Sequence, residues 1–263
     1  STNNPATPGP TKSTCARGWK RFEQRCTQYA ARKTQTPAVG ASLAARFQTL
    51  GYRAASDAPT TIFERTKPMS KKIEFLFDVG SPTAYLAWSQ LPAICERTGA
   101  ELVYTPVLLG GIFKATGNNP PGAVPAKGMY MMRDLARYSA RYQVPLTMNP
   151  HFPVNTITPM RIITAAIGTP EQDAVITALY NAMWREPCKL SEPEEITRVL
   201  TAAGLDAQAW LDKAASDEVK EQLKTNTEAA IKRGVFGAPT MFVGNEMFFG
   251  QDRLDFVEEE VKK

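Results

Sequence analysis

Apolar positions follow strand-like and then helical spacing in the first well-patterned part of the chain. Residues 73–77 form a short apolar run typical of a buried strand, and residues 102–107 form a second. Between them, apolar side chains recur at helical spacing over residues 82–98, with Pro82 at the first helical position and Gly99 directly after the last. The order strand, helix, strand predicts two parallel strands joined by a right-handed crossover.

Helical spacing then dominates most of the remaining chain. The expected helices cover residues 127–142, 159–166, 170–184, 192–203, 207–213, 217–232 and 252–261. Strand-like runs return only at 240–243 and 246–249, on either side of the two-residue turn Gly244-Asn245, which predicts a hairpin. Because strands stand at both ends and helices between them, the order predicts one four-stranded sheet with an inserted helical block.

Residues 1–68 differ in composition from the rest of the chain. They hold 11 Lys and Arg residues but only 3 Asp and Glu residues, which makes them a basic extension. Residues 1–13 are polar and proline-rich, which predicts disorder. Two interpretations stay open: a translated leader ahead of a natural start at Met69, or an Arg-rich and acid-poor organelle-targeting segment. The lack of an apolar core region argues against a secretory signal.

Charge and composition exclude several classes of function. The sequence pI is about 9.0, but residues 69–263 hold 20 basic and 23 acidic residues, so no nucleic-acid partner is expected. No apolar run reaches the roughly 18 residues of a membrane span, so no membrane partner is expected. The 4 cysteines have no disulfide-dense spacing, which favours a reducing compartment: the cytoplasm, or an organelle matrix if residues 1–68 are a targeting segment.

Ser81 is the first candidate for chemistry. It lies in the turn Asp78-Val79-Gly80-Ser81-Pro82-Thr83-Ala84-Tyr85, between the first strand and the first helix. In a thioredoxin-like chain this turn normally carries Cys-x-x-Cys, and here it holds no cysteine. A serine before a first-turn proline is by itself a helix N-cap. Its hydroxyl and the free N–H groups of the first helical turn also favour an anion such as a thiolate.

Pro239 is the second candidate, in the segment Gly237-Ala238-Pro239-Thr240 directly before the strand at 240–243. A cis bond at this proline would turn the preceding backbone groups outward, where an extended peptide can pair with them. A plain proline at the start of a strand is the alternative. A third candidate is the Gly- and Pro-rich loop expected over residues 108–128. Its Asn118 and Lys127 suit an amide and a carboxylate, unless they are only solvated.

The remaining reactive side chains are expected to be mostly structural. His151 is the only histidine, and a solvated or capping role is expected for it in a loop. Cys95 lies on an apolar helix face and is expected in the core, whereas Cys188 in a loop is expected to be exposed. Tyr180 and Trp184 fit a helix stripe, although they could also wall a substrate pocket. No metal site is expected.

Taken together, the turn at 78–85, the loop at 108–128 and the segment at 235–254 resemble the kappa-class glutathione transferases and the bacterial 2-hydroxychromene-2-carboxylate isomerases. The resemblance covers about residues 70–263. It implies an α/β fold, a thioredoxin-like four-stranded sheet with an inserted all-helical domain of the DsbA type, with glutathione as cofactor and a homodimer. The expected ranges are 1–68 for the extension, 69–125 with 226–263 for the thioredoxin-like domain, and 126–225 for the helical insertion.

The resemblance also implies residue roles around the sulfur of glutathione. Ser81 would face the sulfur and is the expected catalytic residue, acting as a thiolate stabiliser rather than as a nucleophile. Ala238, before the expected cis Pro239, would pair its backbone with the cysteinyl part of the tripeptide.

The same resemblance implies contacts to the two ends of the tripeptide. Asn118 and Lys127 would contact the tripeptide or the substrate, with the backbone of Pro125 nearby. Gln251 and Asp252, at the start of the last helix, would hold the γ-glutamyl end, where a carboxylate suits its ammonium group.

These roles favour a glutathione-dependent isomerase that interconverts 2-hydroxychromene-2-carboxylate and trans-o-hydroxybenzylidenepyruvate, an aromatic keto acid, in aromatic degradation. A thiolate would add to the conjugated carbon, and Lys127 or Lys114 could stabilise the enolate. The alternative is a kappa-like transferase or peroxidase acting on other electrophiles. A third possibility is a peptide-binding module, for which Ser81→Ala leaves function intact. A disulfide oxidoreductase is least favoured because the turn lacks cysteine.

Overall fold

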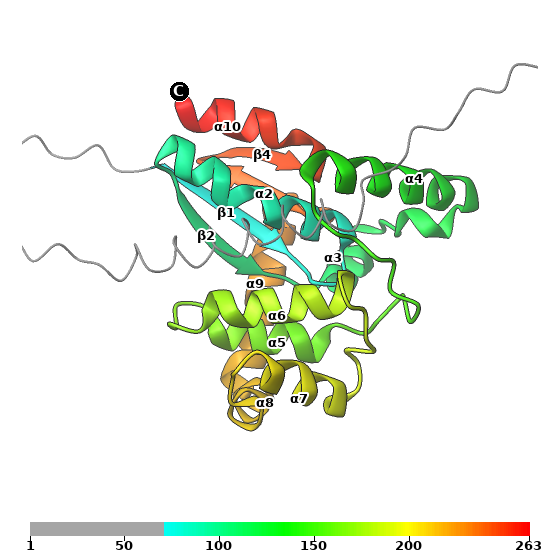
Figure 1. The fold of residues 1–263 in the computed structure, drawn as a ribbon. Helices are drawn as coiled ribbons and strands as arrows, with labels where there is room; N and C mark the ends of the chain where they lie inside the picture. Colours follow the sequence, from blue (N-terminus) through cyan, green and yellow to red (C-terminus); the bar gives the residue numbers. More distant parts are fainter. Residues whose placement is uncertain (1–70) are drawn as a thin grey trace, which may run out of the picture.

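The computed structural model describes residues 71–263, and the predictions for residues 1–68 lie outside that range. Within it, the chain forms a mixed sheet of four strands and nine α-helices (Figure 1). The strands are β1 (Lys72–Phe77), β2 (Glu101–Pro106), β3 (Thr240–Val243) and β4 (Glu246–Phe249). The helices are α2 (Pro82–Thr98), α3 (Leu109–Thr116), α4 (Pro125–Tyr142), α5 (Ile157–Ala166), α6 (Gln172–Trp184), α7 (Pro193–Ala202), α8 (Ala207–Ala215), α9 (Asp217–Lys232) and α10 (Leu254–Lys262), with 3-10 turns η1 (Pro121–Ala123) and η2 (Gln251–Arg253).

The two ends of the described chain meet in one sheet with the strand order β2-β1-β3-β4. β1 and β2 run parallel, from Lys72 beside Glu101 to Phe77 beside Pro106. β3 is antiparallel to β1, and β4 is antiparallel to β3. The predicted four-stranded thioredoxin-like sheet, its parallel pair and its hairpin are therefore confirmed.

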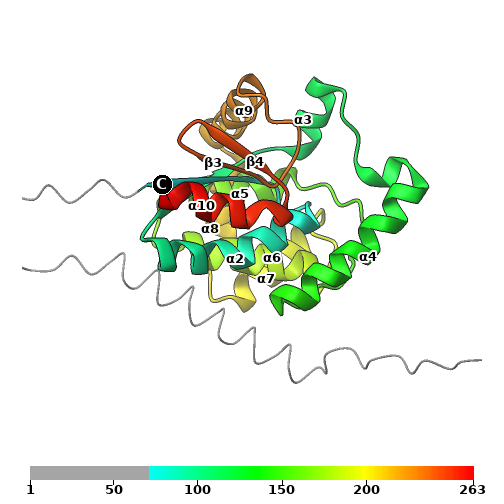
Figure 2. The same ribbon diagram turned by 90° about the horizontal axis from the view of Figure 1, so that it is seen from above.

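Alternation along β1 directs side chains into two helical layers. Phe75 and Phe77 are fully buried in the larger core, which α2 and α10 complete. Leu76 points the other way and packs with Ile112 of α3 and Ala230 of α9. Figure 2 shows α3 and α9 on one side of the sheet and α2 and α10 on the other. Helices therefore cover both faces of the sheet. The turn from β1 into α2 lies at the end of the sheet where β1 finishes.

The boundaries of α2 follow from its terminal residues. Pro82 occupies the first turn, where its missing N–H breaks no helical hydrogen bond. Gly99 ends the helix with φ +71° and donates its N–H to the carbonyl of Cys95 (2.9 Å). A residue with a Cβ is strained in that left-handed conformation, which is why glycine stands there. The predicted range 82–98 is confirmed.

The loop prediction for residues 108–128 was wrong for residues 109–116, which form α3, and for residues 125–128, which form the first turn of α4. Gly110-Gly111 lowers the intrinsic helix propensity of this segment and hides it in the sequence. The helix forms because Ile112 is fully buried in the core on the α9 side. The N–H of Leu108 also donates to Thr227 Oγ1 of α9 (3.0 Å). Tertiary packing therefore outweighs local propensity here.

Helices α4 to α8 are inserted between β2 and β3. Figure 1 shows α5, α6, α7 and α8 gathered below the sheet, and Figure 2 shows α4 extending to one side of the body. α9 continues without a break from Asp217 to Lys232, so the expected boundary between 225 and 226 falls inside a helix. The domain ranges stay a prediction. Between residues 71 and 263, no helix has both the length and the apolar character that a membrane span requires.

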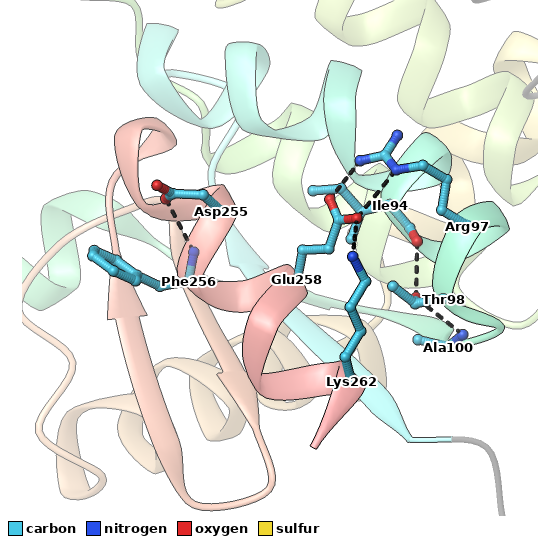
Figure 3. Close-up of polar contacts among 8 residues, drawn as sticks. All are labelled: Ile94, Arg97, Thr98, Ala100, Asp255, Phe256, Glu258 and Lys262. Atoms are coloured by element: carbon cyan, nitrogen blue, oxygen red, sulfur yellow. Dashed lines mark hydrogen bonds and ion pairs between the residues drawn. The ribbon is translucent and has the colours of Figure 1, made fainter.

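The C-terminal helix is fastened to α2 by a charged cluster (Figure 3). Arg97 Nη2 lies 2.5 Å from Glu258 Oε2, and Arg97 Nε donates to Glu258 Oε1 (3.2 Å). Lys262 Nζ donates to the same Oε1 (2.8 Å). Hydrogen bonds from Arg97 and then from Lys262 lower the pKa of Glu258 to about 2. The ionised form of this carboxyl is therefore favoured by folding.

Glu258→Gln is expected to lower the free energy of unfolding at neutral pH by at most about 1 kcal/mol, because the exposed Arg97 is partly screened by solvent. The folded-state pKa lies below the unfolded value of 4.5, so this stability is present above pH 4.5 and is lost as the pH falls toward about 2. Urea unfolding from neutral to acid pH measures the difference. Glu259→Gln, at an exposed neighbour on α10, is the control, and equal pH profiles for the two variants would contradict the prediction.

Candidate active site

The turn between β1 and α2 is organised by the carboxyl group of Asp78. Ser81 N–H donates to the backbone carbonyl of Asp78 (3.0 Å) and closes the turn. Asp78 Oδ1 accepts from Gly80 N–H (2.8 Å), and Oδ2 accepts from Leu109 N–H (2.9 Å). The side chain of Thr156 bonds to the same carboxyl group. One side chain therefore joins the turn to the beginnings of α3 and α5.

Asp78 is only 2% exposed. This burial raises the pKa of its carboxyl group above the ordinary value, and the hydrogen bonds from Leu109, Gly80 and Thr156 act in the opposite direction. A buried carboxylate is stable only when its oxygens are hydrogen-bonded, and each of these partners meets that need. The turn is thus held by the carboxyl group of Asp78, and a substitution that removes one of its acceptor oxygens should destabilise it.

The inserted helices fix the middle of the same turn. Val79 N–H donates to Met160 Sδ of α5 (3.3 Å), and Trp184 Nε1 of α6 donates to Val79 C=O (2.7 Å). A Cβ at Gly80 would lie 3.0 Å from Thr156 Cγ2, so glycine allows α5 to approach this closely. The helical insertion therefore takes part in positioning the turn.

Ser81 caps α2 and also reaches across to the segment before β3. Its Oγ accepts from Ala84 N–H (3.2 Å) and donates to the carbonyl of Ala238 (2.9 Å). Thr83 Oγ1 lies 2.9 Å from Ser81 Oγ and 3.3 Å from the same carbonyl. The N-cap expected for Ser81 is confirmed. The structure adds a cluster of two hydroxyls and one carbonyl, hereafter the hydroxyl cluster (Ser81, Thr83 and Ala238).

The Ala238-Pro239 peptide bond is cis, as the sequence predicts. The expectation that the preceding carbonyl is free was wrong, because the two hydroxyls of the cluster occupy the Ala238 carbonyl. The backbone N–H of Ala238 donates to no acceptor within residues 71–263 and is the backbone group left for a ligand. The carbonyl of Pro239 accepts from Gly250 N–H (3.0 Å), which ties the loop to η2.

Asn118 lies beside this loop. Its Nδ2 donates to the carbonyl of Phe236 (2.8 Å), so the residue joins the segment after α3 to the segment before β3. The ring of Phe236 packs on Phe249 with centroids 4.6 Å apart. A Cβ at Gly237 would lie 2.8 Å from Phe249 Cε2, so this aromatic pair closes over the glycine. The structure therefore links Asn118 to the Ala238 segment.

Pro125 and Lys127 occupy the first turn of α4, where both are exposed. No contact within the described residues links either side chain to the hydroxyl cluster. Apolar side chains are exposed on the same part of the helix, including Met129 at 63% and Tyr130 at 61%. The structure thus does not join these two predicted site residues to Ser81.

Gln251 and Asp252 lie in η2, directly after the residue that bonds to Pro239. Gln251 is buried, and its backbone carbonyl accepts from the hydroxyl of Tyr142 on α4 (2.6 Å). The carboxylate of Asp252 is exposed and pairs with the guanidinium of Arg253. An ammonium group bound by Asp252 would therefore compete with Arg253.

The sequence interpretation missed three polar residues near the turn. Asp78 and Thr83 were quoted only as part of the turn motif. Tyr180 was expected in a helix stripe or as a wall of a substrate pocket, with no role for its hydroxyl. The hydroxyl of Tyr180 is buried and has no hydrogen-bond partner among residues 71–263. Burial raises the pKa of this hydroxyl, and the charge of Asp78 raises it further. A carboxylate after an apolar strand was the only signal available, and it pointed to Asp78.

Tyr180→Phe is expected to raise the free energy of unfolding by up to about 1 kcal/mol, because it removes a buried hydroxyl that forms no hydrogen bond. The ring would keep its packing against Trp88, 4.8 Å away between centroids. Tyr85→Phe is the matched control, since Tyr85 donates to the carbonyl of Pro145 (2.9 Å) and should lose about 1 kcal/mol. Chemical denaturation measures both. Equal destabilisation of the two variants would show the prediction to be wrong.

Cys188 is 8% exposed, so the expectation of an exposed thiol was wrong. Burial is the main cause that raises the pKa of this thiol to about 11, and the hydrogen bond and charge of Glu195 raise it further. The thiol is therefore a poor nucleophile at neutral pH. Cys95 is buried in the core, as predicted. His151 is exposed, and its backbone N–H donates to Asn149 Oδ1 (2.9 Å). Among residues 71–263, no three His, Cys, Asp or Glu side chains gather as metal ligands would.

Comparison with known proteins agrees with this geometry. The family described as a DSBA-like thioredoxin domain matches residues 72–262. A 2-hydroxychromene-2-carboxylate isomerase of Sphingobium xenophagum is 36% identical over 192 residues, which cover 72% of this chain and 97% of that protein. Glutathione S-transferase kappa 1 of Homo sapiens is 32% identical over 208 residues, covering 72% and 90%. A solved 2-hydroxychromene-2-carboxylate isomerase structure has a TM-score of 0.65 and 28% identity, covering 72% of this chain and 93% of that one.

The fold and the site define a thioredoxin-like protein with a helical insertion and a serine turn that faces a cis-proline loop. The chain belongs to the DsbA-like thioredoxin family. The resemblance to the isomerases and kappa transferases is confirmed, and the protein, like these relatives, is an enzyme.

Proposed function

We propose that this protein is a glutathione-dependent isomerase that interconverts 2-hydroxychromene-2-carboxylate and trans-o-hydroxybenzylidenepyruvate in aromatic degradation. At the coarser level it is a glutathione-related isomerase or transferase of the DsbA family. The observation that carries the proposal is the hydroxyl cluster in a turn that contains no cysteine. Hydroxyls cannot exchange disulfides, so the reactive sulfur has to arrive with the ligand.

Glutathione would lie across the two segments that the hydroxyl cluster joins. Its cysteinyl carbonyl would accept from the N–H of Ala238, which has no acceptor of its own within residues 71–263. Its sulfur would then lie beside Ser81 at the beginning of α2, where the helix dipole and the hydroxyls favour a thiolate. Its γ-glutamyl ammonium would pair with Asp252, which the bond from Gly250 to Pro239 holds near the loop. Asn118, Pro125 and Lys127 would contact the remainder of the tripeptide or the substrate.

The proposed reaction changes geometry without net redox. The glutathione thiolate adds to the conjugated carbon of the unsaturated keto acid, a C–S bond forms, and the electron pair moves to the carbonyl oxygen as an enolate. The former double bond rotates as a single bond. The enolate then expels the thiolate and restores the double bond in the trans form. Ser81 and its neighbours hold the thiolate, and Lys127 or Lys114 would stabilise the enolate.

The test is an absorbance assay of the full-length protein with 2-hydroxychromene-2-carboxylate. The rate should depend on glutathione and should disappear when S-methylglutathione replaces it, because the analogue has no thiol. No absorbance change with the chromene and glutathione would overturn the isomerase proposal.

A transferase of the kappa type is the second candidate, favoured by the similarity to glutathione S-transferase kappa 1 at 32% identity. The same thiolate would attack an electrophile that carries a leaving group, or would reduce a peroxide. The two functions share every group up to the thiolate and differ only in the second substrate. Turnover of a chlorinated nitrobenzene without turnover of the chromene would select the transferase.

We also propose that the protein is a homodimer, as the family resemblance implies. The exposed apolar side chains on the first half of α4, including Met129 and Tyr130, provide surface that a second copy could cover. Their burial in a dimer would remove apolar area from water at the end of the molecule that carries Lys127.

A further inference from the structure

The hydroxyl cluster contains more hydrogen-bonding capacity than one serine supplies. Ser81 Oγ, Thr83 Oγ1 and the carbonyl oxygen of Ala238 lie 2.9, 2.9 and 3.3 Å apart. Each hydroxyl carries one hydrogen and can accept from others, whereas the carbonyl only accepts. The cluster therefore contains two hydroxyl hydrogens but only one carbonyl to accept them.

The hydrogen of Ser81 has a structural use. It bonds to the Ala238 carbonyl at 2.9 Å and joins two segments that lie 157 positions apart in the chain. If Ser81 turned its hydrogen toward a ligand, the buried carbonyl would keep only the longer 3.3 Å contact to Thr83. A buried carbonyl that loses its donor destabilises the fold, so releasing this hydrogen is unfavourable.

The hydrogen of Thr83 has no such use. When it leaves the cluster, the bond from Ser81 to Ala238 remains, and Ser81 Oγ still accepts from Ala84 N–H (3.2 Å). Thr83 is also half-buried, whereas Ser81 is 3% exposed, so Thr83 is the hydroxyl with the better access to a ligand. Exposure and hydrogen-bond accounting thus favour the same residue.

We propose that Thr83 is a second catalytic hydroxyl, which donates a hydrogen bond to the glutathione thiolate while Ser81 keeps the Ala238 carbonyl in place. This inference rests on the proposed function, because it requires glutathione in the site. Thr83 keeps its own proton throughout, and the thiol proton leaves to solvent. The hydrogen bond stabilises the thiolate relative to the thiol and so lowers the pKa of the thiol of bound glutathione.

The test compares Thr83→Val, which keeps the branched shape and removes the hydroxyl, with Thr83→Ser, which keeps the hydroxyl. The full-length variants are saturated with glutathione, and the pKa of the bound thiol is read from the ultraviolet absorbance of the thiolate during a pH titration. Thr83→Val should raise that pKa by roughly one unit, the size expected for the loss of one hydrogen bond to an ion. Thr83→Ser should leave it within about 0.3 unit of the wild-type value.

Binding of glutathione to each protein is measured in parallel by calorimetry. If the wild type binds glutathione and Thr83→Val shows an unchanged thiol pKa, the role of Thr83 is overturned and the proposed function stands. If the wild type does not bind glutathione, the proposed function falls and this inference falls with it. Thr83→Ala provides a second variant without the hydroxyl, and it should show the same shift as Thr83→Val.

Discussion

Replacing Ser81 with alanine is expected to lower kcat/KM for the glutathione-dependent reaction about 100-fold, because the site loses the bond that holds the Ala238 segment and the neighbour that positions the Thr83 hydroxyl, which is the preorganised donor. The change removes the acceptor of Ala84 N–H and the donor to the Ala238 carbonyl. The cis-proline loop then loses its bond to the turn, and Thr83 loses its neighbour in the hydroxyl cluster. Steady-state kinetics with glutathione and the chromene measure the effect.

Ser216→Ala is the matched control for that experiment. Ser216 caps α9, where its side chain accepts from Val219 N–H (3.3 Å) at an exposed site. Each variant should lose about 1 kcal/mol of stability through the lost cap, and Ser81→Ala should lose more because the Ala238 carbonyl also loses its donor. Only Ser81→Ala should lose activity. Equal activity of the two variants would contradict a role for Ser81 in catalysis.

Asp78→Asn is expected to lower the free energy of unfolding by about 3 kcal/mol and to reduce activity with it. Both carboxyl oxygens accept backbone N–H groups, from Gly80 and from Leu109. The amide of asparagine has the same shape, but its nitrogen would face one of these donors with another donor. Urea denaturation and the glutathione assay measure the two effects. Asp206→Asn, at the exposed cap of α8, should cost less than about 1 kcal/mol.

The difference in the free energy of unfolding between the wild type and Asp78→Asn should change with pH in a defined direction. Burial raises the folded-state pKa of Asp78 above the unfolded value of 3.8, so the folded protein holds this proton to higher pH. The contribution of Asp78 to stability is therefore complete below pH 3.8 and falls as the pH rises through the raised value. The asparagine side chain of the variant does not titrate, so the stability gap between wild type and variant should narrow over that window. A gap that widens with pH would contradict the direction of the shift.

The sequence predicted correctly those elements whose ends are marked by proline, glycine or a turn-forming pair. Pro82 and Gly99 define α2, and Gly244-Asn245 defines the hairpin, because each of these residues fixes backbone geometry by itself. The helix α3 was missed because its stability comes from the burial of Ile112 and not from its glycine-rich sequence. Local pattern does not report packing between segments distant in the chain.

The candidate site shows the same division. Ser81 was predicted as a helix cap from its neighbours in sequence, and that role was confirmed. Its bond to Ala238 could not be predicted from spacing, since it depends on how the two ends of the described chain fold together. The hydroxyls of Thr83 and Tyr180 carried no signal, because a threonine in a first turn and a tyrosine on an apolar stripe are ordinary, and the pattern suggested at most a pocket wall for Tyr180. Their significance arises only from what lies beside them.

The order of strands in the sheet has a consequence for synthesis of the protein. β1 lies between β2, which comes soon after it in the chain, and β3, which begins only at Thr240. During translation, β1 and α2 emerge early, but the third strand and the Ala238 segment emerge only after the inserted helices. A nascent chain therefore exposes one edge of β1 until the inserted helices and β3 have been synthesised. Catalytic competence should therefore appear only when Ser81 first contacts Ala238, 157 positions later in the chain.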